Sequence, residues 1–206
     1  MKSYKNWVWI LLFGTLWGIS ELIGGEAFYR NNVPHASVWL SAWAFVVLAI
    51  GRGFVNKPGS STAIGGMAAL YKLINAAPYF CHLLGILFLG LTFDIVTSAL
   101  IKEERKKSWR GALSGVISAY SGYALFALVI TYIVRYDPWV AGGWPKVSHH
   151  IFVGGSYAAL TALLAVPLGL WLGVNGWILA GRRPRWAYAS AFVALAVLWT
   201  LGRFIG

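Results

Sequence analysis

The run CHLLGILFLGLTFDIVTSALI, residues 81–101, decides the class of this protein, because it is apolar over a length that crosses a membrane. A helix needs about 20 mostly apolar residues to span the ~30 Å hydrocarbon core of a bilayer. Working outward from it, further apolar runs recur along the whole chain. Seven spans are predicted, at about 7–27, 36–55, 61–77, 81–101, 111–134, 152–180 and 186–204. We expect an all-α fold, a polytopic transmembrane helical bundle of six to seven spans in a single transmembrane domain, residues 1–206.

Two of these runs depart from a simple span. The third, 61–77, is short and contains Lys72, which predicts a tilted or partly re-entrant helix. The sixth, 152–180, is too long for a helix along the membrane normal and contains Pro167, which predicts a kink or a strong tilt. The third span therefore decides whether the count is odd or even.

The composition agrees with a membrane protein. Hydrophobic residues make up 59% of the chain and charged residues 11%, whereas a soluble domain has about 25% charged residues. The net charge is +11, but the basic residues form no patch interleaved with aromatic residues, so we expect no nucleic-acid partner. The first apolar run continues to about Ala27 without a small-x-small cleavage site, which predicts an uncleaved first span.

The basic residues also predict the orientation of the chain. With the N-terminus inside and the links assigned alternately, 12 of the 17 Lys and Arg residues fall on the inner side and four on the outer side. Links rich in Lys and Arg stay in the cytoplasm. We therefore expect a multi-pass protein of the inner (cytoplasmic) cell membrane with a cytoplasmic N-terminus, and with the C-terminus outside if seven spans is correct.

This orientation brings three links together on the outer side: 24–35, 75–82 and 135–150. They hold all four histidines and the only cysteine of the chain. Thiolate and imidazole are ligands of cobalt, iron, copper and zinc. Adjacent side chains on a helix diverge, so a multidentate site would need more than one link. The candidate metal ligands are Cys81, His82, His35, His149 and His150; the alternatives are a packed Cys81 and an interfacial pair at His149 and His150.

Aromatic side chains are dense at the same level. An interfacial belt of Trp and Tyr is common in membrane proteins, and a wall for a large, flat, partly apolar ligand is the functional alternative. Together with polar neighbours, these residues give the candidate ligand contacts: Cys81, His82, Tyr79, Phe80, Asn75, Tyr29, Arg30, Trp139 and Trp144.

Three ionisable residues fall inside predicted spans: Glu21, Lys72 and Asp94. Charge inside a membrane is costly, so such residues usually face the bundle interior and have a partner. A Lys72–Asp94 pair on consecutive antiparallel spans is expected, with Glu21 as the other partner for Lys72. Either pair could be structural or could serve a ligand or a proton.

Three Gly-x-x-x-Gly patterns allow helices to approach closely where lipid gives no hydrophobic drive. They begin at Gly14, Gly111 and Gly169, and packing within the chain is an alternative for each of them. The first, Gly14 with Gly18, is the candidate for docking a partner, because its span otherwise offers a broad apolar face.

The sequence contains no motif of a known catalytic site. His-Glu-x-x-His, the phosphate-binding Gly-x-x-x-x-Gly-Lys-Ser/Thr pattern and the nucleophile elbow are all absent. We therefore expect no catalytic residue and no ATP hydrolysis by this chain alone, and energised transport would need partner subunits.

With its short-linked helices and outer links, the chain resembles the substrate-binding S components of energy-coupling-factor vitamin transporters. Gly14-Thr-Leu-Trp-Gly18 is similar to the helix-one motif that docks those subunits on the membrane coupling subunit. The single cysteine, in the link between the third and fourth spans, is similar to that of the cobalamin-specific type, which implies Cys81 as a cobalt ligand. The departure is the count of spans, since most S components have six, and the N-terminal histidine motif of the seven-helix cobalt and nickel relatives is absent.

The leading hypothesis is therefore a membrane protein that binds and takes up a vitamin-like ligand. Cobalamin or another metallo-tetrapyrrole is the favoured ligand, with ATPase and membrane coupling subunits as partners. The alternatives are a membrane-embedded enzyme dependent on a metal or haem, and a non-catalytic subunit of a larger membrane complex.

Overall fold

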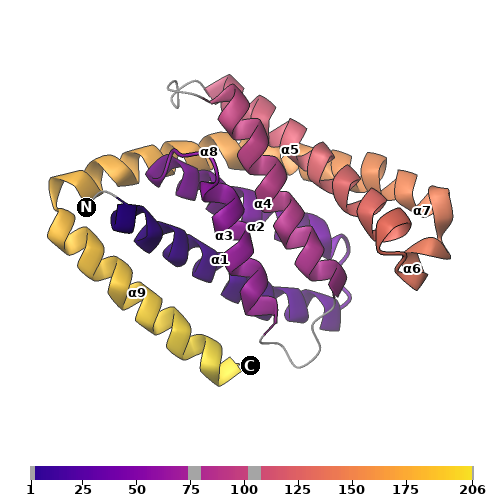
Figure 1. Ribbon diagram of the computed structural model, residues 1–206, viewed down its shortest axis with the longest axis horizontal. Coiled ribbons are helices and arrows are strands. Elements are labelled where there is room, and N and C mark those ends of the chain that lie inside the picture. Colours follow the sequence, from indigo (N-terminus) through magenta and orange to yellow (C-terminus); the bar gives the residue numbers. More distant parts are fainter. Residues whose placement is uncertain (1–2, 74–79, 102–107, 206) are drawn as a thin grey trace.

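The structure is a computed structural model that describes residues 3–73, 80–101 and 108–205, and these residues are arranged as helices joined by short links (Figure 1). Seven long or medium helices correspond to the seven apolar runs, and short helical segments connect two of them. In chain order the elements are α1 Ser3–Arg30, α2 Ala36–Phe54, α3 Ser60–Lys72, α4 Phe80–Leu100, α5 Ser108–Leu128, η1 Val129–Ile133, α6 Asp137–Val140, α7 Gly143–His149, η2 His150–Gly154, α8 Gly155–Arg182 and α9 Pro184–Ile205.

The all-α prediction is confirmed for the described residues. Five stretches are long and apolar enough to cross a membrane: Asn6–Phe28, Ala36–Phe54, Phe80–Leu100, Ser108–Ile133 and Gly143–Arg182. The chain is thus a helical membrane protein whose apolar surface contacts lipid. The count of six to seven spans remains a prediction, because α3 has only 13 residues, about 20 Å of helix, and α9 is not among the five.

Six helices close a ring. α1 packs on α3, α3 on α4, α4 on α5, α5 on α8, α8 on α2, and α2 returns to α1. The helix α9 lies outside this ring and packs mainly on α1 (Figure 1). Trp17, Phe45 and Phe93 are fully buried between the ring helices, whereas other large side chains of the same helices, such as Trp109 and Trp171, are exposed.

Glycines set the closest helix contacts. A Cβ on Gly53 of α2 would lie 2.6 Å from Cα of Gly173 on α8, and a Cβ on Gly115 of α5 would lie 2.6 Å from the carbonyl oxygen of Ala162 on α8. Real Cβ atoms do not approach so closely, so only glycine fits at these positions. The patterns at Gly111 and Gly169 therefore serve packing within the chain.

Gly14 and Gly18 belong to the same class of internal contact. Both are buried, and added Cβ atoms would lie 2.6 Å from Met67 and 2.7 Å from Tyr71 on α3. The prediction that these two glycines form a surface for docking a partner is therefore corrected, because α3 already occupies that face of α1.

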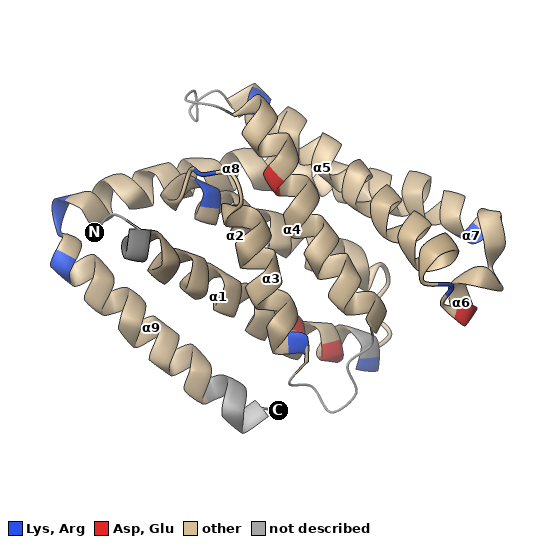
Figure 2. Cartoon of the chain, viewed as in Figure 1, with Lys and Arg blue, Asp and Glu red and all other residues tan. Residues whose placement is uncertain are grey.

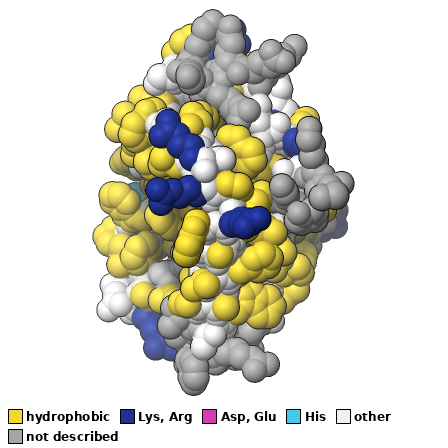
Figure 3. Space-filling model, turned by 90° about the vertical axis from the view of Figure 1, so that its left-hand side faces the viewer, with side chains coloured by type: hydrophobic (Ala, Val, Ile, Leu, Met, Phe, Trp, Pro, Cys, Tyr) yellow, Lys and Arg dark blue, Asp and Glu magenta, His cyan; other side chains and the backbone are white. Residues whose placement is uncertain are grey.

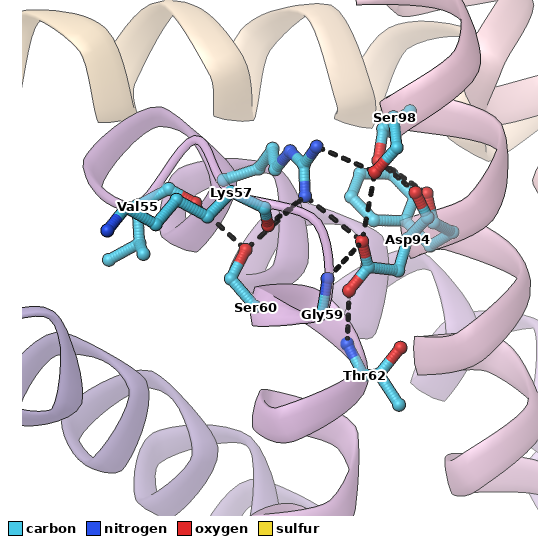
Figure 4. A network of polar contacts seen from close by, with 10 residues as sticks. Val55, Lys57, Gly59, Ser60, Thr62, Asp94 and Ser98 are labelled. Carbon is cyan, nitrogen blue, oxygen red and sulfur yellow. Dashed lines mark hydrogen bonds and ion pairs between the residues drawn. The ribbon is translucent and has the colours of Figure 1, made fainter.

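A buried polar network fixes the start of α3 (Figure 4). The guanidinium of Arg52 donates to Asp94 Oδ1 at 3.0 Å and to Ser98 Oγ at 2.8 Å. The same carboxylate accepts the backbone N–H of Gly59 at 3.0 Å and of Thr62 at 2.8 Å. A carboxylate at a helix N-terminus satisfies free N–H groups and matches the helix dipole. Asp94 thus caps α3 from the neighbouring helix.

The predicted Lys72–Asp94 pair is wrong. Asp94 binds at the first residues of α3, whereas Lys72 is its last residue, and ten residues of helix separate Thr62 from Lys72 by about 15 Å. Arg52 supplies the partner instead, with its side chain only 3% exposed. Arg52 stands near the end of α2, where the sequence predicts a charge on the inner side of the membrane. Its side chain turns into the bundle instead, and this brings the guanidinium to Asp94.

The opposite end of the ring is closed by the connection between α5 and α8. Here α5 widens into the π-helical segment η1, the short helices α6 and α7 follow, and the π-helical segment η2 leads into α8 (Figure 1). Arg135 and Gly143 turn the chain with positive φ values of 55° and 54°. This end lies away from the N-terminus and from the turn between α8 and α9.

Candidate ligand-binding site

The helices of the ring border a partly open cavity of about 340 Å³. α1, α2, α3, α4 and α5 contribute side chains to its walls, and Trp139 of α6 and His150 of η2 also line it. Apolar ligand pockets with a few polar groups have volumes of ~300–1,000 Å³. The cavity therefore has the size of a site for a compact organic molecule.

One wall of the cavity carries opposite charges. Glu21 and Lys72 both line it and are 8% and 6% exposed. The indole N–H of Trp17 donates to Glu21 Oε1 at 3.1 Å, and Lys72 Nζ donates to the backbone oxygen of Glu21 at 2.9 Å. Lys72 therefore contacts Glu21, which is one of the two predicted pairings. The contact is to the backbone oxygen of Glu21 and not to its carboxylate.

Gly25 keeps space between these two charges. It lies one helical turn beyond Glu21 on α1, and an added Cβ would stand 3.3 Å from Lys72 Nζ and 3.8 Å from Glu21 Oε2. Any larger residue would fill the part of the cavity that both charged groups border.

Aromatic rings form another part of the lining. Tyr123 stacks on His150 with ring centroids 4.7 Å apart, and Trp139 meets His150 edge to face at 5.1 Å. Phe126 contacts both Trp139 and His150 at 5.2 and 5.5 Å. Four rings in such contact offer a surface on which a flat apolar group can pack.

A hydroxyl group and a backbone carbonyl of α2 hold Tyr123 in this cluster. Its phenol oxygen lies 3.2 Å from Ser41 Oγ and donates to the backbone oxygen of Ser37 at 3.4 Å. Both serines are on α2 and line the cavity, so α2 and α5 are joined across it by polar contacts.

Of the predicted metal ligands, the structure brings Cys81, His82 and His150 to the cavity. His35 instead packs its ring against Tyr157 at 5.0 Å, and His149 is exposed. Within the ranges that the structure describes, no group of three or more His, Cys, Asp or Glu side chains could hold a metal ion. The five predicted ligands therefore do not form one multidentate site.

The other predicted ligand contacts also lie partly at the cavity and partly outside it. Trp139 lines the cavity. Phe80 and Trp144 are exposed, and Arg30 is an exposed partner of Glu26. Asn75, Tyr79 and the side chain of Tyr29 lie outside the described residues.

Several lining residues were not singled out from the sequence, among them Trp17, Ser37, Ser41, Tyr123 and Phe126. Their spacing could have indicated them. Trp17 stands four residues before Glu21, Ser37 and Ser41 are four apart, and Tyr123 and Phe126 are three apart, which places each pair on one helix face. That the faces converge is a property of the ring alone.

No family model, curated protein or solved structure matches this chain. The cavity combines several kinds of side-chain chemistry. It offers a carboxylate, an ammonium, a thiol, two imidazoles and an aromatic wall, which is chemistry suited to reversible binding of a partly apolar molecule.

Proposed function

We propose that this chain is a membrane-embedded binding protein for a compact organic molecule and that it takes part in the uptake of that molecule. The observation that carries the proposal is the cavity among the ring helices, with buried charges on one wall and a cluster of four contacting aromatic rings in its lining. A vitamin-sized molecule with a flat ring and polar substituents fits both the volume and the lining.

The distribution of charge supports an outward-facing site. Figure 2 shows Lys and Arg at the turn between α8 and α9, where Arg182, Arg183 and Arg185 are exposed. Figure 3 looks onto this end, and basic side chains gather there among hydrophobic ones. Since positive ends stay in the cytoplasm, α6 and α7 at the opposite end would face outward, with the N-terminus cytoplasmic.

Uptake would require other subunits. The sequence contains no phosphate-binding motif, so ATPase and membrane coupling subunits would supply the energy, as the resemblance to S components implies. Because Gly14 and Gly18 are occupied by α3, docking would use another surface of the ring.

A metallo-tetrapyrrole such as cobalamin is the second candidate ligand. The observation that favours it is that Cys81, the only cysteine, lines the cavity together with His82 and His150. Thiolate or imidazole would then be the axial ligand of the metal. The cavity of about 340 Å³ accommodates a single heterocycle as a whole, whereas a corrin ring with its side groups is much larger and would extend through the open side.

The test is ligand binding by the protein purified in detergent. Small ring-bearing vitamins, cobalamin and haem are added separately, and the melting temperature and the absorption spectrum are recorded. A ligand at 100 times its Kd stabilises the folded state by about 2.7 kcal/mol, so a binding compound raises the melting temperature. Trp139→Ala should abolish the shift, and Trp144→Ala, at an exposed tryptophan outside the cavity, should preserve it.

The spectra separate the two candidates. A cobalamin band that shifts on binding and is lost in Cys81→Ala supports the second candidate. A compact vitamin that binds equally well to Cys81→Ala supports the first. If no compound changes the melting temperature and no small molecule leaves the protein on denaturation, the proposed binding function is wrong.

A further inference from the structure

The cavity holds two buried opposite charges that do not form an ion pair with each other. Glu21 and Lys72 are each more than nine-tenths buried. In the part of the chain that the structure describes, ion pairs join Arg30 to Glu26 and Arg52 to Asp94, and none joins the carboxylate of Glu21 to the ammonium of Lys72. This separation contrasts with the Arg52–Asp94 pair, where the charged atoms meet at 3.0 Å.

Each group keeps unused hydrogen-bonding capacity. Glu21 accepts the Trp17 N–H at Oε1, and the second oxygen borders the space beside Gly25. Lys72 carries three N–H donors, of which one binds the backbone oxygen of Glu21. A buried charge without compensation costs several kcal/mol, so a ligand that reaches both groups gains from satisfying them.

The charges also constrain what such a ligand can be. A purely cationic molecule would pair with Glu21 and face the Lys72 ammonium, and a purely anionic one would face the Glu21 carboxylate. An apolar molecule would leave both charges unsatisfied. A molecule that presents a donor and an acceptor side by side satisfies both groups and keeps the cavity neutral.

We propose that the cavity selects a ring-bearing molecule with a hydrogen-bond donor for Glu21 and an acceptor for Lys72, such as an ammonium with a carboxylate or a ring N–H with a ring carbonyl. The ring packs on Tyr123, Phe126, Trp139 and His150. This inference rests on the proposed binding function and adds the ligand class to it.

The test uses matched sets of three compounds on phenyl, indole, pyridine and pyrimidine rings. Within each set one compound carries both groups, one carries only the donor, and one carries only the acceptor; tryptophan, tryptamine and indole-3-propionate are the indole set. Binding to the unmodified protein in detergent is measured by calorimetry and thermal shift. In the set whose ring fits, we expect the compound with both groups to bind at least tenfold more tightly than either partner.

Two variants assign the groups to their residues. Glu21→Leu removes the acceptor and should abolish the advantage of the two-group compound over the acceptor-only compound. Lys72→Met removes the donor and should abolish the advantage of the two-group compound over the donor-only compound. The controls are Glu26→Leu, at an exposed residue on the same helix, and Lys57→Met, at an exposed lysine outside the cavity; both should bind as the unmodified protein does.

The outcomes separate this inference from the function on which it rests. If single-group or apolar compounds bind as tightly as their two-group partner, the inference is wrong while the binding function stands. The same holds if both variants bind the two-group compound unchanged. If neither these compounds nor the vitamins bind, the function itself fails. The comparison of compounds on the unmodified protein decides the matter even where a variant does not fold.

Discussion

The carboxylate of Asp94 makes three kinds of structural contact. Its carboxylate pairs with Arg52, accepts the hydroxyl of Ser98, and caps the first turn of α3. These contacts are buried, so their loss leaves a guanidinium and two backbone N–H groups without their acceptor. Removing one member of a buried ion pair destabilises a protein far more than replacing both members by apolar residues does.

We predict that Asp94→Ala lowers the stability of the protein by about 3–5 kcal/mol, the usual cost of leaving one buried charge alone. Glu26→Ala, which removes an exposed ion pair with Arg30, should cost about 0–1 kcal/mol. Unfolding of the purified protein in detergent, followed by circular dichroism, measures both. Equal stability of the two variants would show that the buried network does not hold α3.

Residue identity alone indicated the intramembrane charges and the approach of Lys72 to Glu21, but not the partner of Asp94. Glu21, Lys72 and Asp94 are conspicuous in an apolar sequence, and all three are buried. Arg52 was not singled out from the sequence, because an arginine at the end of an apolar run normally lies in the aqueous link. Only the path of its side chain between α2 and α4 made it the partner of Asp94.

Among the helices, α8 is the one against which both α2 and α5 pack. It packs on α2 through Gly169 and Gly173 and on α5 through Gly115. A small residue at such a contact allows backbones to approach, which is the main source of helix association in lipid. The same helix also presents a glycine, Gly181, that has no heavy atom within 4 Å of its Cβ position.

These two kinds of glycine give a matched prediction. Gly173→Ala inserts a methyl group against Ile50 and Gly53, and overpacking of this kind costs about 1–3 kcal/mol. Gly181→Ala meets open space and should stabilise α8 by up to about 1 kcal/mol, the helix propensity difference. Thermal unfolding in detergent measures both changes. A neutral Gly173→Ala would contradict the close approach of α2 and α8.

The same comparison tests the assignment of Gly14 and Gly18. Gly18→Ala would crowd Tyr71, whereas Gly66→Ala on α3 meets open space. We expect Gly18→Ala alone to lower the melting temperature of the isolated chain, because internal packing needs no partner. A variant with unchanged stability but impaired assembly with a coupling subunit would restore the docking hypothesis for this face.

The whole molecule has two unlike ends. One carries the exposed arginines of the turn between α8 and α9, and the other carries α6 and α7 (Figure 1). Since Cys81 is the only cysteine, its replacement gives a background in which single new cysteines report orientation.

In the Cys81→Ser background, we predict that Trp144→Cys reacts with a membrane-impermeant maleimide added to intact cells. Arg183→Cys should react only after the membrane is opened, because the positive end of the bundle stays in the cytoplasm. Both residues are exposed in the structure, so burial does not explain a difference. Labelling in the reverse order would overturn the proposed orientation.

The sequence by itself determined the class of the protein and the positions of its helices. Long apolar runs leave few alternatives to helix in lipid, because every backbone group must be hydrogen-bonded within its own segment. Six of the predicted runs agree to within a few residues with α1, α2, α4, α5 with η1, α8 and α9, whereas the third run, predicted to reach residue 77, corresponds to α3, which ends at Lys72. The same argument could not fix the number of spans, because α3 has only 13 residues and α9 is not among the five long apolar stretches. Asp94 caps the first turn of α3 inside the bundle.

Only the tertiary structure decided which residues meet. Glu21, Lys72, Cys81, His82, Trp139 and His150 were predicted individually, and the ring of helices brings them to one cavity. The ring also adds Trp17, Tyr123 and Phe126, and it leaves His35 and Trp144 outside. The physical reason is that helix rotation follows from the glycine contacts between neighbours, which the spacing along one chain does not specify.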